Sequence, residues 1–260
     1  MNTKKLTGRF EWQRPEVMPS FVKGDDAQEL CYAVKEGFGF FDYDANEKLM
    51  KGSNPFISAR IDTEVRPLGL RVANLRDLSR PEVMAMVEGR YYSDSPVLVV
   101  RSNKDSNTRN LPLIKIISEL TEDVNGRVEF PFMLTGYDVV KLPEDEDGYG
   151  VDIVKREDFK AVHDDRLSGK YNGWKFDNVD EIGLPSGLNK SKGSRTLYTK
   201  DEGLAGFCLD WDLDLVSVDG NLQGSNAIGR VVVVSAFSAS QNLDKYVEDI
   251  LLKSRYKTLL

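Results

Sequence analysis

Seven basic and hydroxyl side chains between residues 76 and 135 have the chemistry of an anion site. They are Arg76, Arg80, Arg101, Ser102, Lys104, Arg109 and Thr135. Guanidinium and ammonium groups hold phosphate or carboxylate oxygens through charge-assisted hydrogen bonds, and hydroxyl groups add further donors. Several of them stand just before a predicted helix, where free backbone N–H groups also favour negative charge. The pattern predicts a site for a phosphate or a carboxylate.

These side chains need three strands and two helices to bring them together. Apolar runs predict strands at residues 70–75, 96–100 and 128–134, and helical spacing with capping residues predicts helices at 80–88 and 111–122. The run at 96–100 is aliphatic on both faces, as in a parallel sheet covered on both sides. This order is the βαβαβ signature. Parallel neighbours would place the three trailing turns at one rim, where ligands bind in open α/β sheets.

The same composition has a second interpretation that involves no ligand. Polar loops between a buried strand and a helix commonly carry helix caps and solvated arginines. The anion site and the solvated loop are therefore both kept open. Loss of phosphate-ligand binding after replacement of Arg101 and Arg109 with alanine would distinguish them.

The chain offers little for catalysis by known constellations. Its one histidine, His163, excludes zinc sites built from several histidines. No nucleophile elbow and no Gly-rich dinucleotide fingerprint occurs. Asp210, Asp212 and Asp214 alternate along a predicted strand and could hold a divalent cation, but a solvent-facing strand gives the same pattern. We therefore assign no catalytic residue, metal or cofactor, and the sequence leaves open whether the protein is an enzyme.

The sequence also predicts structural elements before and after the βαβαβ unit. Upstream, the pattern predicts a helix at 27–36, a strand at 38–43 and a turn at 52–55. Downstream, residues 143–200 are polar and predict loops, with one short helix that contains His163.

The last sixty residues predict two strands and a closing helix. Strict alternation predicts a strand at 208–216, and a second strand is expected at 228–237. An apolar stripe that begins near residue 242 predicts a helix that closes the fold.

Together these elements predict a mixed α/β protein with a partly parallel sheet. The expected organisation is a helix–strand segment at 1–64, the βαβαβ core at 65–142, a polar insertion at 143–200 and a β-hairpin with the closing helix at 201–260. At roughly 150 residues per domain, the length allows one large domain or two small ones, and we expect one compact domain overall.

Composition restricts the compartment and the class of partner. Basic residues number 35 and acidic residues 42, which leaves a net charge of −7 and disfavours non-specific coating of DNA. The longest aliphatic runs, at 97–100 and 231–234, are far shorter than the roughly 18 residues of a membrane span. Two distant cysteines, Cys31 and Cys208, fit a reducing compartment. We expect a cytoplasmic protein without a membrane partner.

Three functional hypotheses follow. The first is a non-catalytic binding or assembly protein with an anion-binding edge and a tendency to self-associate. The second is an enzyme that acts on a phosphate-bearing substrate. The third is a nucleic-acid-binding protein that uses the loops at 101–109 and 190–200 as one basic surface.

Overall fold

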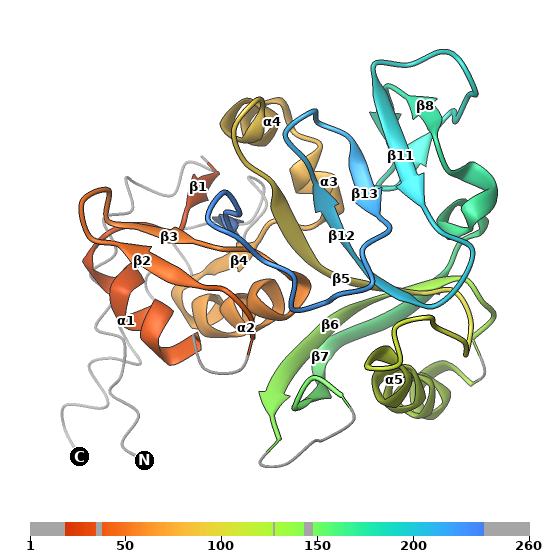
Figure 1. Ribbon diagram of the computed structural model, residues 1–260, viewed down its shortest axis with the longest axis horizontal. Helices are drawn as coiled ribbons and strands as arrows, with labels where there is room; N and C mark the ends of the chain where they lie inside the picture. The colour runs from red at the N-terminus through yellow and green to blue at the C-terminus, as the bar shows by residue number, and fades with distance from the viewer. Residues whose placement is uncertain (1–18, 35–37, 127, 143–147, 237–260) are drawn as a thin grey trace, which may run out of the picture.

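A computed structural model describes residues 19–34, 38–126, 128–142 and 148–236 of the chain (Figure 1). Its main element is a mixed sheet of seven strands. In spatial order these are β7 (Val151–His163), β6 (Phe132–Lys141), β5 (Ser93–Val100), β12 (Leu204–Leu209), β13 (Leu215–Ser217), β11 (Arg195–Thr199) and β8 (Trp174–Phe176). β11 and β13 pair in parallel, and the other neighbouring pairs of this sheet are antiparallel. The expected mixed α/β class with a partly parallel sheet is confirmed.

Three smaller groups of strands accompany the main sheet. One small sheet has the order β1 (Ser20–Phe21), β14 (Val232–Ser235) and β4 (Leu70–Val72). Two short antiparallel pairs are β2 (Asp42–Asp44) with β3 (Leu49–Lys51) and β9 (Asn178–Val179) with β10 (Pro185–Ser186). The sheet with β1 therefore joins the two ends of the described chain to the strand β4.

Helices cover both faces of the main sheet. The α-helices are α1 (Asp25–Val34), α2 (Pro55–Val65), α3 (Leu75–Leu78), α4 (Pro81–Val87) and α5 (Asn110–Asn125). Short 3₁₀ helices are η1 (Arg66–Leu68), η2 (Asp165–Leu167) and η3 (Gly169–Tyr171). Within the described residues, no helix is both long and apolar enough to cross a membrane.

The strand β5 shows why both sheet faces are apolar. Leu98 and Val100 point into the core under α2 and α5, whereas Val97 and Val99 point into a second core that includes α3 and α4. All four side chains are buried. The interpretation of this run as a strand buried on both sides is confirmed.

The parallel βαβαβ arrangement is wrong. β4 lies in the small sheet, and β5 and β6 pair antiparallel with Val100 opposite Phe132. The other neighbour of β5 is β12, a strand more than a hundred residues away in the sequence. Burial on both faces reports only that each face is covered, and antiparallel strands between helices meet that condition as well. The apolar pattern thus carried no information on strand direction.

The helix α2 was not predicted, since its first residues were interpreted as a turn. Asn54 caps it, with its side-chain oxygen accepting from the N–H of Ile57 at 2.8 Å, and Pro55 occupies the first turn. Both residue types favour helix starts. α2 packs against β4, β5 and β6 and is therefore central to the core.

Several other predicted elements differ from the structure. The helix expected around His163 is wrong, because this residue ends the long strand β7, which also runs through the segment expected to be loops. The single strand expected at 208–216 is wrong, because β12 ends at Leu209 and β13 begins at Leu215. Between them lies a turn, in which the Asp210 N–H donates to the Asp214 carbonyl at 3.1 Å. The expected closing helix lies outside the described residues.

Candidate ligand pocket

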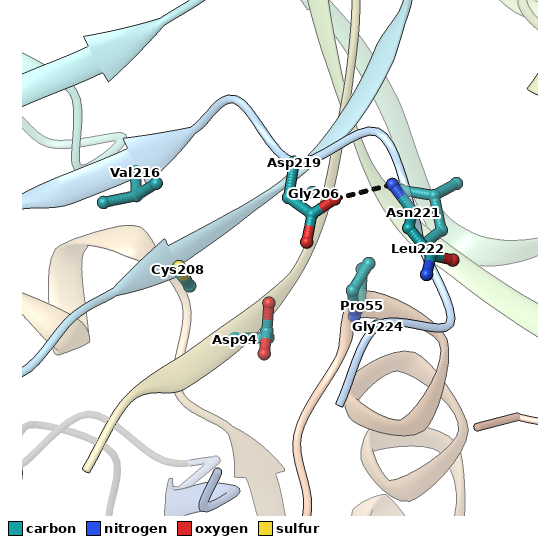
Figure 2. A pocket seen from close by; sticks show the side chains of 9 residues that line it. All are labelled: Pro55, Asp94, Gly206, Cys208, Val216, Asp219, Asn221, Leu222 and Gly224. Atoms are coloured by element: carbon teal, nitrogen blue, oxygen red, sulfur yellow. Dashed lines mark hydrogen bonds between the residues drawn. The ribbon is translucent and has the colours of Figure 1, made fainter. Parts of the chain in front are cut away.

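A small cavity opens where α2, β5, β12 and the loop after β13 meet (Figure 2). Its volume is about 40 Å³. The lining residues are Pro55, Asp94, Gly206, Cys208, Val216, Asp219, Asn221, Leu222 and Gly224. One water needs about 10–15 Å³ measured in this way, so the cavity has room for a group of a few atoms.

Asp94 forms the floor of the cavity. It stands near the start of β5, opposite Cys208 on β12. Its backbone N–H donates to the Ser53 hydroxyl at 2.9 Å, and its backbone carbonyl accepts from the Ser58 hydroxyl at 2.9 Å. Only 8% of the residue is exposed. These bonds fix the backbone of Asp94 against the start of α2, and Figure 2 shows its carboxyl group directed towards the centre of the pocket.

One oxygen of the Asp94 carboxyl group has no hydrogen-bond partner. This atom, Oδ2, is buried. Burial raises the pKa of Asp94 from its ordinary value of 3.8 to about 7; a hydrogen bond with Ser53 lowers it and the charge of Asp219 raises it. Near neutral pH the group is therefore present in both protonation states. A buried polar group without a partner costs free energy, so this oxygen requires an explanation.

The thiol of Cys208 and the phenols of Tyr92 and Tyr137 around Asp94 stay uncharged near neutral pH. Burial raises the pKa of the Cys208 thiol well above its ordinary value, with a further contribution from Asp94. Burial raises the pKa of Tyr92 to about 12, and burial also raises the pKa of Tyr137. Asp219 stands at the exposed mouth of the cavity and accepts from the Asn221 N–H at 2.7 Å. The negative charge of the pocket therefore comes from Asp94 and Asp219.

The wall that carries Asp219 is anchored from behind. The Gly220 carbonyl accepts from the amides of Asn107 and Asn110, each at 2.9 Å, and from the Tyr149 hydroxyl at 3.0 Å. The same hydroxyl accepts from the Leu222 N–H at 3.2 Å. The loop is thus held on both sides of Asn221, which keeps one wall of the pocket in place.

Arg101, a predicted anion-binding residue, lies in the interior at 5% exposure. Its guanidinium donates to the Leu167 carbonyl at 2.6 Å and to the hydroxyls of Thr199 and Ser217 at 2.7 and 2.9 Å. Its Nη1 atom is buried without a partner. Burial lowers the pKa of Arg101 to about 9. The guanidinium cross-links three segments and retains one unused donor.

Three further predicted residues lie in the loop that follows β5. Arg109 lies over the Tyr149 ring, 4.1 Å from its centroid, and donates to the Gln223 side chain at 2.8 Å. Ser102 and Lys104 belong to a local turn, in which the serine hydroxyl donates to the Lys104 carbonyl at 3.0 Å. Lys104 is exposed.

The remaining predicted residues stand apart from this loop. Arg76 is an exposed residue of α3, and Arg80 pairs with Glu82 at 3.5 Å. Thr135 lies within β6, opposite Lys160 of β7, rather than in a turn. The common rim of parallel strands that was to gather the seven side chains is therefore absent. The correction follows directly from the antiparallel pairing of β5 with β6.

Of the three alternating aspartates, Asp210 and Asp214 accept backbone hydrogen bonds through their side chains, and Asp212 is exposed. The Asp210 side chain accepts from the N–H groups of Asp212 and Asp214 at 3.0 and 2.9 Å. Asp214 in turn accepts from the Thr196 N–H. In the described part of the chain, no three His, Cys, Asp or Glu side chains are grouped so that they could hold a metal ion.

Asp94 lies outside the strand expected from the sequence, which begins two residues later at Pro96. In the stretch Ser93–Val100, Asp94 shares a face with Leu98 and Val100. An acidic residue on a face that is otherwise fully apolar was the available signal.

Comparisons of the chain with protein-family models, with curated proteins and with solved structures returned no significant match. The function must therefore be argued from the site.

Proposed function

We propose that the protein is a non-catalytic binding protein whose pocket accepts a small positively charged group of its ligand. The observation that carries this proposal is the Oδ2 atom of Asp94, which is buried, lacks a partner and belongs to a side chain that lines a cavity. The ligand supplies the missing partner. Asp94 is the counter-ion, and Asp219 adds negative charge at the entrance.

Burial disfavours the ionised form of Asp94. Moving an isolated carboxylate out of water costs several kcal/mol, and the group regains this free energy only through a paired charge or hydrogen bonds. The elevated pKa of Asp94 expresses that cost. The hydrogen bond with Ser53 stabilises the carboxylate only in part, and a bound cation would supply the remaining stabilisation.

Binding fits the pocket better than catalysis. General acid–base or nucleophilic catalysis requires a reactive group and a second group that activates it. The Cys208 thiol beside Asp94 is held in its protonated, unreactive form because burial raises its pKa. Asp94 is thus a ligand-binding carboxylate rather than one half of a catalytic pair.

The test is a titration with a panel of small cations, namely K⁺, NH₄⁺, methylammonium and Mg²⁺, as chloride salts in amine-free buffer at pH 8. Chemical shifts of the Gly206 and Gly224 amides report on the pocket. We expect saturable shifts with at least one cation and their loss in Asp94→Asn. The matched control is Asp212→Asn, which removes the same charge from an exposed turn. The proposal is refuted if no cation produces saturable shifts, or if Asp94→Asn binds as the parent does.

A second candidate function retains the phosphate-bearing ligand. The unused Nη1 donor of Arg101 favours it, because the hydrogen bonds of this cation go to a carbonyl and two hydroxyls. Inorganic phosphate should raise the melting temperature, and Arg101→Lys should reduce that shift, since lysine lacks the planar fork of donors. Arg109→Ala tests the neighbouring loop without removing a buried group. An unchanged shift in both variants would contradict an anion site here.

The other hypotheses from the sequence stay predictions. Retention on DNA that weakens steeply with salt would support nucleic-acid binding, and a mass that depends on concentration would support self-association. Cytoplasmic location likewise remains a prediction from the two cysteines.

A further inference from the structure

We propose that the group bound at Asp94 is a primary ammonium ion, R–NH₃⁺, and that its binding releases a proton from Asp94. This inference rests on the proposed function and specifies its ligand class. Four features carry it: the oxygen atoms around the cavity, the side chains absent from its described lining, the apolar part of that lining, and the buried surroundings of Asp94.

The acceptors in the pocket suit an ion with several N–H donors. Figure 2 shows the carboxyl groups of Asp94 and Asp219 entering the same space from opposite walls, with Asn221 beside Asp219. An ammonium group has three N–H donors and no acceptor. It can therefore donate to more than one acceptor, and we assign the two carboxylates that line this cavity to it. Its own charge compensates the buried Oδ2 of Asp94, which a neutral hydroxyl would not do.

Two other classes of cation fit the pocket less well. Quaternary ammonium ions are held by aromatic cages, and the nine described lining residues include no aromatic side chain. Divalent cations require more oxygen ligands, six to eight for Ca²⁺ and a near-ideal octahedron for Mg²⁺. Among the described residues, the grouped carboxylates or thiols needed for such an ion are not found. A primary ammonium fits better than either class, because it needs only two or three acceptors.

The apolar part of the lining suits the carbon that carries the ammonium group. Pro55, Val216 and Leu222 contribute hydrocarbon surface to the lining. A cavity of about 40 Å³ accepts the ammonium head and little more, so the rest of the ligand must extend through the mouth. A slender carrier such as a methylene chain is compatible with this shape, whereas a branched cation is not.

Release of a proton follows from the surroundings of Asp94. The groups that face it are Ser53 before α2, Tyr92 on its own segment, Tyr137 on β6, Cys208 on β12 and Asp219 at the mouth. None of them carries a positive charge. With a pKa of about 7, Asp94 is mostly protonated at pH 6, and an arriving cation displaces that proton to solvent. Only the ionised fraction binds, so the apparent Kd should fall about tenfold from pH 6 to pH 8.

The experiment compares methylammonium with tetramethylammonium and Mg²⁺ by amide chemical shifts at pH 6 and pH 8. A pH-stat on an unbuffered solution counts the protons released. We expect a millimolar Kd for methylammonium, as befits a ligand of two heavy atoms. Its affinity should be about tenfold higher at pH 8 than at pH 6, with close to one proton released at the lower pH and almost none at the higher. Tetramethylammonium and Mg²⁺ should bind at least about tenfold more weakly.

Three variants and the choice of cation distinguish the proposed ligand class from the existence of the cation pocket. Asp94→Asn should lose binding and proton release together, Asp219→Asn should weaken binding but retain its pH dependence, and Asp212→Asn should resemble the parent. Equal or tighter binding of tetramethylammonium or Mg²⁺ would overturn the ligand class and leave the cation pocket intact. Methylammonium binding without pH dependence would overturn the proton release. Failure of every cation to bind would overturn the proposed function itself.

Discussion

Replacement of Asp94 with asparagine should change how the stability of the protein depends on pH. The pKa of Asp94 is about 7 in the folded protein against 3.8 ordinarily, so between these values the folded state binds the proton and the unfolded state does not. The contribution of Asp94 to stability is therefore complete below pH 3.8 and is lost as pH rises through 7. At 1.36 kcal/mol per unit, the parent should lose about 2.5 kcal/mol between pH 5 and pH 8 from this group. The asparagine variant cannot lose it.

The assay is urea unfolding of both proteins at pH 5, 6, 7 and 8 in amine-free buffers, since protonated amines are the proposed ligands. Subtracting the two curves removes the contributions of other titrating groups, because they are common to both proteins. From pH 5 to pH 8, the free energy of unfolding of the variant should rise relative to that of the parent by about 2.5 kcal/mol, with m-values unchanged. A difference that is constant with pH would refute the conclusion that Asp94 is buried without a compensating charge.

Three further predictions address the walls of the pocket. Tyr149→Phe removes the acceptor of the Leu222 N–H, so hydrogen exchange at that amide should accelerate and stability should fall by about 1–3 kcal/mol; an unchanged exchange rate would contradict the anchoring. Gly206→Ala places a Cβ 2.8 Å from Pro55 Cγ, so it should destabilise the fold by about 1–3 kcal/mol and abolish cation shifts at the Gly224 amide. Cys208 should react with iodoacetamide at pH 8 at least about tenfold more slowly than in the unfolded chain, because burial raises its pKa. Mass spectrometry measures the labelling, and a rate equal to that of the unfolded chain would contradict this prediction.

Local patterns in the sequence identified much of the secondary structure. The helix stripe of α5 is buried at Leu113, Ile114 and Ile117, as its spacing predicts. The aliphatic run of β5 is buried on both faces. These predictions succeeded because side-chain period and apolar content depend on neighbours within a few residues.

Long-range pairing was the part that local patterns could not provide. β12 inserts beside β5 from a distant part of the chain, and β6 runs antiparallel on the other side. A buried strand has the same composition in either direction, so direction and partner depend on how distant segments close against one another. The predicted gathering of arginines at one rim required three neighbouring parallel strands, and it is lost because β4 lies in another sheet and β5 and β6 are antiparallel.

The sequence by itself determined that β5 is apolar on both faces and where α4 and α5 begin, to within one residue. Only the tertiary structure decided that the carboxyl group of Asp94 lines a cavity and lacks a partner for one oxygen. The physical reason is desolvation: Pro55 of α2, Gly206 of β12 and Leu222 of the loop remove water from Asp94, and they come together only when the chain is folded.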